Sequence, residues 1–240
     1  MGPFCFPYFC TCFLTWEFIH THIPTLLLLC LWAYLLGSLP FAIWWGKTFH
    51  GVDVRQHGSG NAGATNVFRT LGNRPGSIVL ALDVTKGYLA AASARLHLSK
   101  YEDGWDYVSS AWIHLTLLLG AMAILGHLFP VFARFKGGKG VATVFGLLIA
   151  LDVAVAASAL GVFLLAALIW RYVSLGSMLA AASLPFWFRL YLSYDFGVLD
   201  GFAWGIAFVV IFMHRKNMQR LKEGTESKMK FLPKHRIEES

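Results

Sequence analysis

Residues 141–170 read VATVFGLLIALDVAVAASALGVFLLAALIW, and Asp152 is the single charged side chain in these thirty residues. A helix needs about 20 residues to cross the ~30 Å apolar core of a bilayer. One strongly tilted, over-long helix is an alternative. We expect two short helices instead, over residues 141–151 and 153–170, because a turn near Asp152 brings its carboxylate to the polar interface.

The composition of the whole chain is that of a membrane protein. The 240 residues are 57% hydrophobic and 14% charged, with a mean hydropathy of +0.58, whereas soluble domains carry about 25% charged residues. A core of this size cannot hide so much apolar surface, so we expect lipid as its solvent. The net charge of +7 gathers in a few loops and the tail, which favours anchoring at a membrane face over nucleic-acid binding.

Further apolar runs cover residues 24–45, 76–94, 107–132, 175–192 and 198–213. Together with the two halves of residues 141–170, they predict an all-α membrane protein. It has seven transmembrane helices, with short re-entrant or interfacial helices in the cytoplasmic loops.

The basic residues orient these seven spans. Sixteen Lys and Arg residues fall on one face and three, namely Arg95, Lys100 and Arg189, on the other. Because cytoplasmic loops are the basic ones, we expect the basic face and the C-terminus in the cytoplasm. Six spans would send the basic tail to the wrong side. The sixteen are Lys47, Arg55, Arg69, Arg74, Arg134, Lys136, Lys139, Arg171, Arg215, Lys216, Arg220, Lys222, Lys228, Lys230, Lys234 and Arg236.

Three segments follow from this pattern. Residues 1–22 form an apolar leader of uncertain role that lacks the basic start and cleavage motif of a signal peptide. Residues 23–214 form the membrane domain, and residues 215–240 form a basic cytoplasmic tail. All four cysteines lie within the first thirty residues, without a histidine at zinc spacing, so we expect no disulfide framework, metal site or cofactor.

A glycine-rich loop, GSGNAGATN at residues 58–66, precedes Arg69. Its small residues let backbone N–H groups approach an anion, and a short helix over about residues 62–70, ending near Gly72, carries Arg69. Ser59 and Asn61 either cap that helix or bind a substrate. A flexible interhelical loop is the alternative. The candidate phosphate-binding residues here are Gly58, Gly60, Asn61, Gly63, Thr65 and Asn66.

The turn FKGGKG at residues 135–140 leads into the apolar stretch that begins at Val141. It lacks the spacing of a P-loop. Lys136 and Lys139 beside the bare amides of Gly137 and Gly138 nevertheless predict a cradle for an anion. The alternative is a basic turn that anchors to anionic lipid head groups.

Two polar sets lie farther along the chain. Arg171, Ser174 and Ser177 are spaced by three and so predict one helical face, either functional or a small-residue packing stripe. His214 and Asn217 follow the last apolar run, where they can orient a hydroxyl or take its proton. A lone interfacial histidine is usually structural. His214, however, is expected on the same membrane face as the glycine-rich loops, which favours a functional role.

Ionisable residues also occur inside the apolar runs. Asp83 and Lys86 stand one turn apart in residues 76–94. Because charges there are expensive, we expect them to pair as an internal brace. His127, near the end of residues 107–132, is expected to pack or cap.

Six blocks of the sequence, taken in order, resemble the bacterial integral-membrane acyl-phosphate:glycerol-3-phosphate acyltransferases. They are LLGSLPFA, GVDVRQHGSGNAGATNVFR, LDVTKGY, LGHLFPVFARFKGGKGVAT, RYVSLGSM and HRKNMQRLKEGTESK, between residues 26 and 228. The leader and Met213, which stands where a polar residue is expected, depart from the family pattern.

The resemblance implies transfer of a fatty acyl group from acyl phosphate to the sn-1 hydroxyl of glycerol 3-phosphate. The products are lysophosphatidic acid and phosphate, at the entry to phospholipid biosynthesis. It implies a bacterial inner membrane, no cofactor and a functional link to the enzyme that makes acyl phosphate. It also carries roles to Asn61, Ser177 and Glu226 as binding residues, and to a catalytic set of Ser59, Arg69, Lys139, His214 and Asn217.

Two other functions compete with this one. An acyltransferase that uses a thioester donor commonly carries H-x4-D, and no histidine here has an aspartate five residues later. An anion transporter would place charges at mid-bilayer or show inverted repeats. Apart from Asp83 and Lys86 the middles of the runs are apolar.

Overall fold

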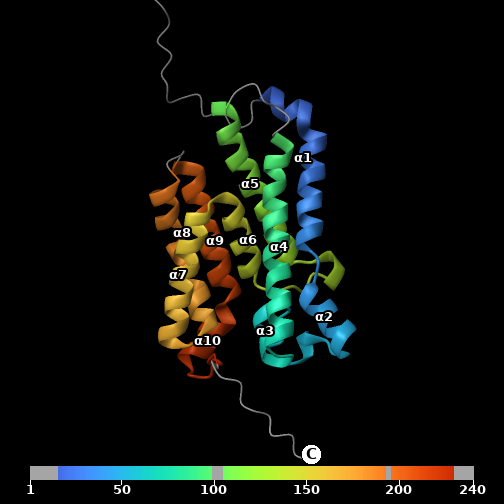
Figure 1. The fold of residues 1–240 in the computed structure, drawn as a ribbon, viewed down its shortest axis with the longest axis vertical. Coiled ribbons are helices and arrows are strands. Elements are labelled where there is room, and N and C mark those ends of the chain that lie inside the picture. The colour runs from blue at the N-terminus through green and yellow to red at the C-terminus, as the bar shows by residue number, and fades with distance from the viewer. Residues whose placement is uncertain (1–15, 99–104, 193–195, 230–240) are drawn as a thin grey trace, which may run out of the picture. The chain divides into compact units, whose positions relative to one another are not determined.

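The computed structural model describes residues 16–98, 105–192 and 196–229, and all regular elements within these ranges are helical (Figure 1). Most of the predicted leader and the last eleven residues of the predicted tail lie outside the described residues. The chain divides into two compact units. Unit 1 contains residues up to 153 together with 193–199, and unit 2 contains residues 154–192 and those from 200 onward.

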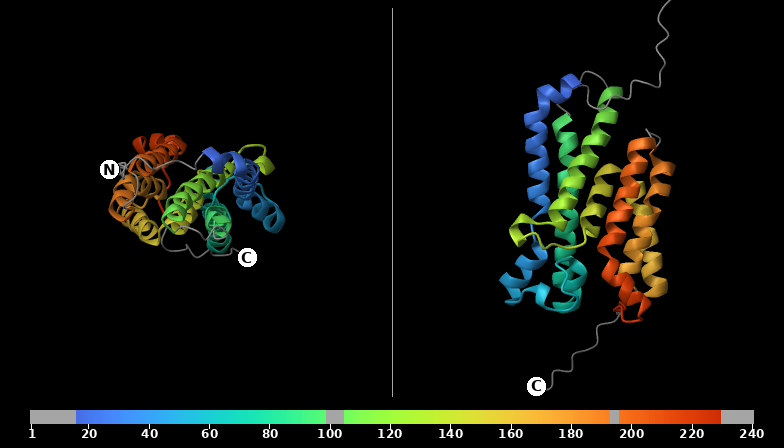
Figure 2. Two further views of the ribbon diagram at one scale, coloured as in Figure 1. Left: turned by 90° about the horizontal axis from the view of Figure 1, so that it is seen from above. Right: turned by 180° about the vertical axis from the view of Figure 1, so that it is seen from behind.

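Among the described residues, unit 1 is built on the long helices α1, α4 and α5 and several shorter ones (Figure 2). Helices α1, α4 and α5 pack around small and aliphatic side chains, among them Ala33, Ala90 and Leu119, and α6 packs along α4. The elements are α1 (Trp16–Gly37), α2 (Phe41–His50), the 3-10 helix η1 (Val54–Gln56), α3 (Ala64–Thr70), α4 (Asn73–Leu98), α5 (Trp105–Leu128), the 3-10 helix η2 (Val131–Ala133) and α6 (Val141–Leu151).

Glycines bring these helices into backbone contact. At four positions an added Cβ would overlap a backbone oxygen of the neighbouring helix. Small residues allow this close approach, which is how membrane helices gain packing energy without a hydrophobic driving force. The pairs are Gly37 with Ala123, Gly126 with Tyr34, Gly87 with Thr143, and Gly146 with Val84.

The first apolar run is not one continuous helix, contrary to the expectation for residues 24–45. Helix α1 ends at Gly37, α2 begins at Phe41, and the two are bent by 40°. Pro40 explains the break, because proline lacks an N–H and its ring disfavours helical backbone at Leu39. The break leaves the carbonyl of Leu39 without a helical partner, and the ammonium group of Lys86 donates a hydrogen bond to it.

Unit 2 contains α7 (Val153–Trp170), α8 (Val173–Tyr191), most of α9 (Phe196–Met213) and α10 (Arg215–Lys222). The predicted break in residues 141–170 is confirmed, since α6 ends at Leu151 and Asp152 has extended backbone (φ −159°, ψ 125°). Helix α9 gives way to α10 at His214 with a bend of 58°.

Within the described residues, four helices are long and apolar enough to cross a membrane, or up to six if each bent pair counts as one span. Helix α6 is a further apolar helix of 11 residues. Large aliphatic side chains are exposed along α7, including Leu165 and Ile169. These features confirm an all-helical membrane protein.

Candidate active site

Asn66 holds the glycine-rich loop in place. Its Oδ1 accepts hydrogen bonds from the backbone N–H of Ser59 (2.8 Å) and from the Ser59 hydroxyl (3.1 Å). Its Nδ2 donates to the carbonyl oxygens of Val54 (2.7 Å) and His57 (3.0 Å). The side chain is buried, and these four bonds use its full hydrogen-bonding capacity. Asn66, expected to bind phosphate, therefore shapes the loop from beneath.

The glycines of this loop allow backbone conformations and close contacts that other residues would not. Gly58 and Gly60 have positive φ values of 61° and 72°, and a Cβ at Gly58 would overlap the Asn66 side chain. Gly63 is the N-cap of α3 and no side chain caps that helix. The alternative that Ser59 or Asn61 caps α3 is therefore wrong, because the Ser59 hydroxyl is turned to Asn66 instead.

The outer side of the loop is open. Ser59 and the glycines at 58 and 60 are exposed. Arg69 lies in the last turn of α3 and is exposed, while Thr65 near its start is half-buried. The exposed backbone and the guanidinium thus come from one short segment of unit 1.

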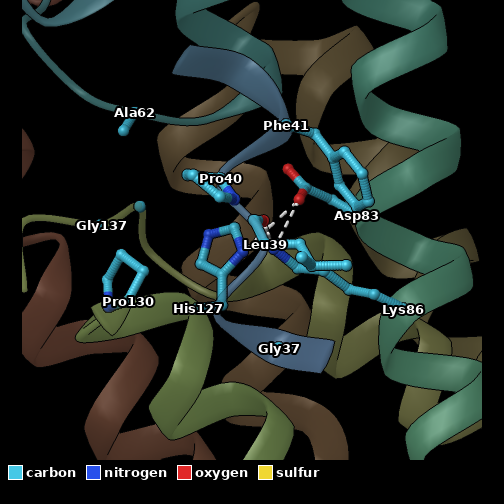
Figure 3. A pocket seen from close by; sticks show the side chains of 11 residues that line it. Gly37, Leu39, Pro40, Phe41, Ala62, Asp83, Lys86, His127, Pro130 and Gly137 are labelled. Atoms are coloured by element: carbon cyan, nitrogen blue, oxygen red, sulfur yellow. Dashed lines mark hydrogen bonds and ion pairs between the residues drawn. The ribbon is translucent and has the colours of Figure 1, made fainter. Parts of the chain in front are cut away.

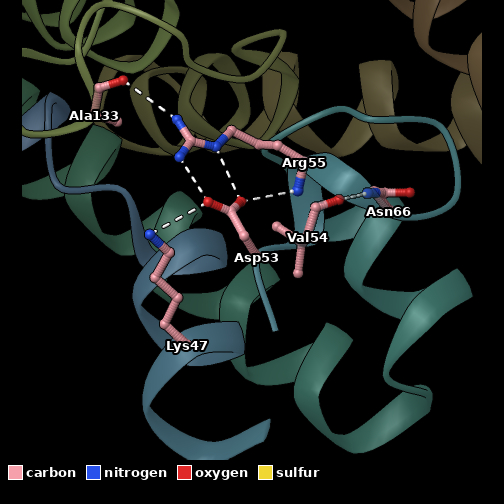
Figure 4. A network of polar contacts seen from close by, with 6 residues as sticks. All are labelled: Lys47, Asp53, Val54, Arg55, Asn66 and Ala133. Atoms are coloured by element: carbon pink, nitrogen blue, oxygen red, sulfur yellow. Dashed lines mark hydrogen bonds and ion pairs between the residues drawn. The ribbon is translucent and has the colours of Figure 1, made fainter. Parts of the chain in front are cut away.

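A carboxylate clamp fixes the start of this loop (Figure 4). Asp53 accepts hydrogen bonds from Arg55 Nε (3.0 Å) and Nη2 (2.7 Å), and Lys47 Nζ lies 3.3 Å from Asp53 Oδ2. Hydrogen bonds from Arg55 hold the pKa of Asp53 well below its ordinary value. Arg55 Nη1 also donates to the carbonyl of Ala133 (3.4 Å), which joins the glycine-rich loop to the segment that precedes the lysines.

The lysine-bearing turn, residues 134–140, has unusual backbone. Arg134 and Phe135 adopt left-handed φ values of 55° and 59°. Gly140, at φ 80°, is the N-cap of α6. Lys136 is exposed and Lys139 is half-buried.

Gly137 and Gly138 press this turn against His127. The N–H of Gly138 donates to the His127 carbonyl (3.2 Å). A Cβ on Gly137 would overlap that oxygen, and one on Gly138 would overlap the imidazole. The same Gly138 Cβ would lie 3.0 Å from the carbonyl oxygen of Ala62. The two anion-binding segments expected from the sequence therefore pack together within unit 1.

A charged cluster of Asp83, Lys86 and His127 lies buried beside the turn (Figure 3). Lys86 Nζ is 2.8 Å from Asp83 Oδ1, which confirms the expected pair, and it donates to the carbonyl of Leu39 (2.9 Å). His127 Nδ1 is 3.6 Å from the same Asp83 oxygen. That third member was missed, because the sequence shows no link between α4 and the end of α5.

In unit 2 the organising group is the carboxylate of Glu226. Its Oε1 accepts hydrogen bonds from Ser174 Oγ (2.9 Å) and Asn217 Nδ2 (2.7 Å), and its Oε2 accepts one from Arg220 Nε (2.7 Å). Burial alone would raise the pKa of Glu226, but the hydrogen bonds from Arg220, Asn217 and Ser174 lower it. Ser174 and Arg220 were not expected as partners of this carboxylate.

His214 is buried at the N-cap of α10. Its Nδ1 lies 2.8 Å from the carbonyl oxygen of Val210. A carbonyl only accepts hydrogen bonds, so Nδ1 carries a proton, and whenever the ring is neutral Nε2 is its basic nitrogen. That is the tautomer a hydroxyl donor requires.

Of the three residues expected on one helical face, only Ser174 and Ser177 lie in the same helix, and Arg171 does not. Ser174 and Ser177 are buried in the first turns of α8, and the Ser177 hydroxyl donates to the carbonyl of Val173 (2.9 Å). Arg171 precedes the N-cap Tyr172 and has a φ of 61°, so it is not on that face. It pairs instead with the backbone of Met229, accepting from its N–H (2.7 Å) and donating through Nη2 to its carbonyl (3.2 Å).

Comparisons with known proteins agree with the sequence blocks. The family model "Glycerol-3-phosphate acyltransferase" matches residues 27–224. A glycerol-3-phosphate acyltransferase of Geotalea daltonii is 44% identical over 198 residues, covering 82% of this chain and 94% of that protein. One from Salinibacter ruber is 41% identical over 207 residues, with 82% and 89% covered.

Two solved structures are similar along nearly the whole chain. The crystal structure of PlsY (YgiH), an integral membrane glycerol 3-phosphate acyltransferase, in its glycerol 3-phosphate form has a TM-score of 0.73 and 38% identity, covering 86% of this chain and 96% of that one. Its lysophosphatidic acid form has a TM-score of 0.70 and 37% identity, with 85% and 95% covered. With matches of this extent and identity, the chain belongs to the glycerol-3-phosphate acyltransferase family of integral membrane enzymes.

Proposed function

We propose that the protein transfers a fatty acyl group from acyl phosphate to the sn-1 hydroxyl of glycerol 3-phosphate. The observation that carries this proposal is the packing of the glycine-rich loop against the lysine-bearing turn. Arg55 bonds to Ala133 and Gly138 lies against Ala62. Two segments suited to phosphate thus lie together, as a reaction between two phosphate compounds requires.

The chemistry needs little covalent help from the protein. Acyl phosphate is a mixed anhydride, so the hydroxyl oxygen attacks its carbonyl carbon and phosphate departs with the electron pair of the broken C–O bond. The hydroxyl proton passes to a base, either a phosphate oxygen or an imidazole. The main obstacle is repulsion between two phosphate anions. Arg69, Lys136 and Lys139 offset that repulsion, and holding the reactants in line supplies a large share of the rate.

The remaining candidate residues divide into two roles. Ser59, His214 and Asn217 orient the acyl phosphate or the attacking hydroxyl, and the His214 Nε2 tautomer suits a hydroxyl donor. Asn66 and Ser177 bond to the surrounding backbone, and Glu226 holds the side chains of Ser174, Asn217 and Arg220. The backbone amides of the two loops bind phosphate oxygens, and they belong to Gly58, Asn61, Gly63, Thr65 and Gly137. The N–H groups of Gly60 and Gly138 already donate to the carbonyls of His57 and His127, so these two glycines shape the loops instead.

A seven-span topology in a bacterial inner membrane fits this function. The four long helices, the two bent pairs and α6 make seven apolar segments. The excess of basic residues supports a cytoplasmic location for both loops and the tail. Because acyl phosphate is reactive, its transfer from the enzyme that makes it is the functional link we expect. Protease cleavage of a C-terminal tag in inverted but not right-side-out vesicles would test the orientation.

The donor is tested by offering three activated acyl groups. Purified protein in lipid nanodiscs receives glycerol 3-phosphate with acyl phosphate, acyl-coenzyme A or acyl-carrier protein. We expect lysophosphatidic acid in all productive reactions and release of phosphate with acyl phosphate only. Equal rates with a thioester would overturn the assignment of the donor. Uptake of glycerol 3-phosphate into sealed liposomes without any acyl product would instead favour transport.

A further inference from the structure

Three ionisable side chains meet where the first helix is broken. Asp83, Lys86 and His127 are only 2%, 3% and 6% exposed. Their contacts join the α1–α2 break, α4 and the end of α5, because Lys86 Nζ binds both Asp83 and the Leu39 carbonyl. Lys86 Nζ also lies 5.6 Å from the centre of the Phe41 ring.

Charge is an expensive way to join three helices inside a membrane protein. A buried ion pair is often no more stabilising than apolar side chains of the same volume. The advantage of a buried ion pair is geometric, since each charged group can be paired with only a few kinds of partner.

The neighbour of the cluster is the lysine-bearing turn. His127 receives the N–H of Gly138 on its carbonyl, and its imidazole fills the space where a Gly138 side chain would stand. A small cavity of about 10 Å³ between them is lined by Asp83, Lys86, His127, Gly137 and Gly138 (Figure 3).

We propose that Asp83, Lys86 and His127 are positioning residues that set the conformation of the lysine-bearing turn. The Asp83–Lys86 pair fixes the imidazole, and the imidazole fixes Gly137 and Gly138. Lys136 and Lys139 then face the phosphate groups in a defined geometry. The assignment of the turn to phosphate rests on the proposed function.

The first test removes the charges while keeping the packing. Lys86→Met alone leaves the Asp83 carboxylate without its cation and should lower the unfolding temperature in detergent. The double variant Asp83→Asn/Lys86→Met carries no buried charge and should recover most of that loss. We nevertheless expect its KM for glycerol 3-phosphate to rise about 10- to 100-fold, as misplaced binding groups do. A double variant with parental stability and parental KM would overturn the proposal.

A second test measures the coupling between the imidazole and the turn. Gly138→Ala should be harmful because its Cβ overlaps the His127 ring, and His127→Ala removes that ring. The loss of kcat/KM in the double variant should therefore be much smaller than the product of the two single-variant losses. Losses that multiply to within about twofold would show independent sites and contradict the proposal.

Thr116→Val provides the control on the same helix. Thr116 is fully buried in α5 and its hydroxyl has no hydrogen-bond partner among the described residues, so KM and kcat should stay parental. Glycerol 3-phosphate binding, measured as a ligand-dependent rise in unfolding temperature, gives a readout without an acyl donor. If the parent protein binds glycerol 3-phosphate but does not react with acyl phosphate, the proposed function fails and this inference is unaffected. If the parent and the double variant Asp83→Asn/Lys86→Met bind glycerol 3-phosphate equally well, this inference fails and the proposed function is unaffected.

Discussion

Glycines inside the helices have different surroundings at the α4–α6 contact of unit 1 and along α7 and α9 of unit 2. In unit 1 a Cβ on Gly87 would overlap the Thr143 carbonyl and one on Gly146 would overlap the Val84 carbonyl, so α4 and α6 touch through their backbones. In unit 2 a Cβ on Gly161 or Gly205 meets nothing within 4 Å. Glycine is therefore a packing requirement at Gly87 and Gly146 and a conformational liability at Gly161 and Gly205, while Gly176 of unit 2 still packs closely on the Phe163 carbonyl.

The polar clusters differ in a parallel way. The cluster of unit 1 is enclosed by helices and balances charge with charge. In unit 2 the Glu226 carboxylate is buried, but the side chain of its cation Arg220 is 33% exposed. The cluster of unit 1 is thus fully enclosed, whereas the cluster of unit 2 has one member, Arg220, that stays in contact with solvent.

The largest expected effect is on the rate and comes from unit 1. Arg69→Ala or Lys139→Ala should reduce kcat/KM at least ~100-fold, as removal of a preorganised charge donor does. The unfolding temperature should barely change for the exposed Arg69. The measurement is phosphate release from acyl phosphate with glycerol 3-phosphate.

Arg74→Ala is the matched control for that loss. Arg74 is exposed at the start of α4, five residues beyond Arg69, and its removal lowers the net charge equally. Its rate should stay within a few-fold of the parent. Equal losses in the two arginine variants would mean that overall charge, rather than a specific contact, attracts the substrates.

The next largest effect is on stability and tests the close packing of α4 and α6. Gly87→Ala and Gly146→Ala should each lower stability by about 1–3 kcal/mol, since overpacking forces the helices apart. The measurement is the unfolding midpoint in detergent, followed by helical circular dichroism. A parental midpoint in both variants would contradict the backbone contacts of unit 1.

Much of the fold follows from the sequence, because lipid imposes simple rules. The break at Asp152 was predictable, since a charge in a thirty-residue apolar run must reach an interface. The break at Pro40 was missed although the proline was visible, because hydropathy alone continues through it. The short helix carrying Arg69 was placed within two residues of its observed start at Ala64.

The site was less predictable, since it depends on side-chain directions. Asn66 was expected to bind phosphate as a member of the glycine-rich loop, yet its side chain donates to the carbonyl oxygens of Val54 and His57. Arg171 was expected on a helix face, but a left-handed backbone at a non-glycine residue leaves no sequence signal. The contacts of His127 with Asp83 and of Ser174 with Glu226 join distant segments, so only packing reveals them.

A smaller effect concerns Glu226 and its pH dependence. At neutral pH Glu226→Gln should lower stability by roughly 1 kcal/mol, since one acceptor becomes a donor. The folded pKa of Glu226 is lowered, so the unfolded chain binds more protons below the ordinary carboxylate pKa of about 4.3. The contribution of Glu226 is therefore complete above that pH and is lost as pH falls through the folded pKa.

The check is the difference in unfolding midpoint between parent and Glu226→Gln at several pH values from 7 to 3. Subtraction removes the other carboxylates, including Asp53, whose pKa is also lowered. The difference should shrink as the solution becomes more acidic. A constant difference would mean that the Glu226 charge adds nothing to its hydrogen bonds.

The smallest expected effect has the opposite sign and comes from unit 2. Gly161 lies inside α7, where an added methyl group meets no described atom within 4 Å. Gly161→Ala should therefore raise stability by about 0.4–1 kcal/mol, because alanine loses less backbone entropy on folding. Gly176→Ala in the same unit is the control, since its Cβ would lie 2.9 Å from the Phe163 carbonyl and should destabilise. If both alanines destabilised the protein equally, Gly161 would be a packing glycine like those of unit 1, and the contrast between the units would fail.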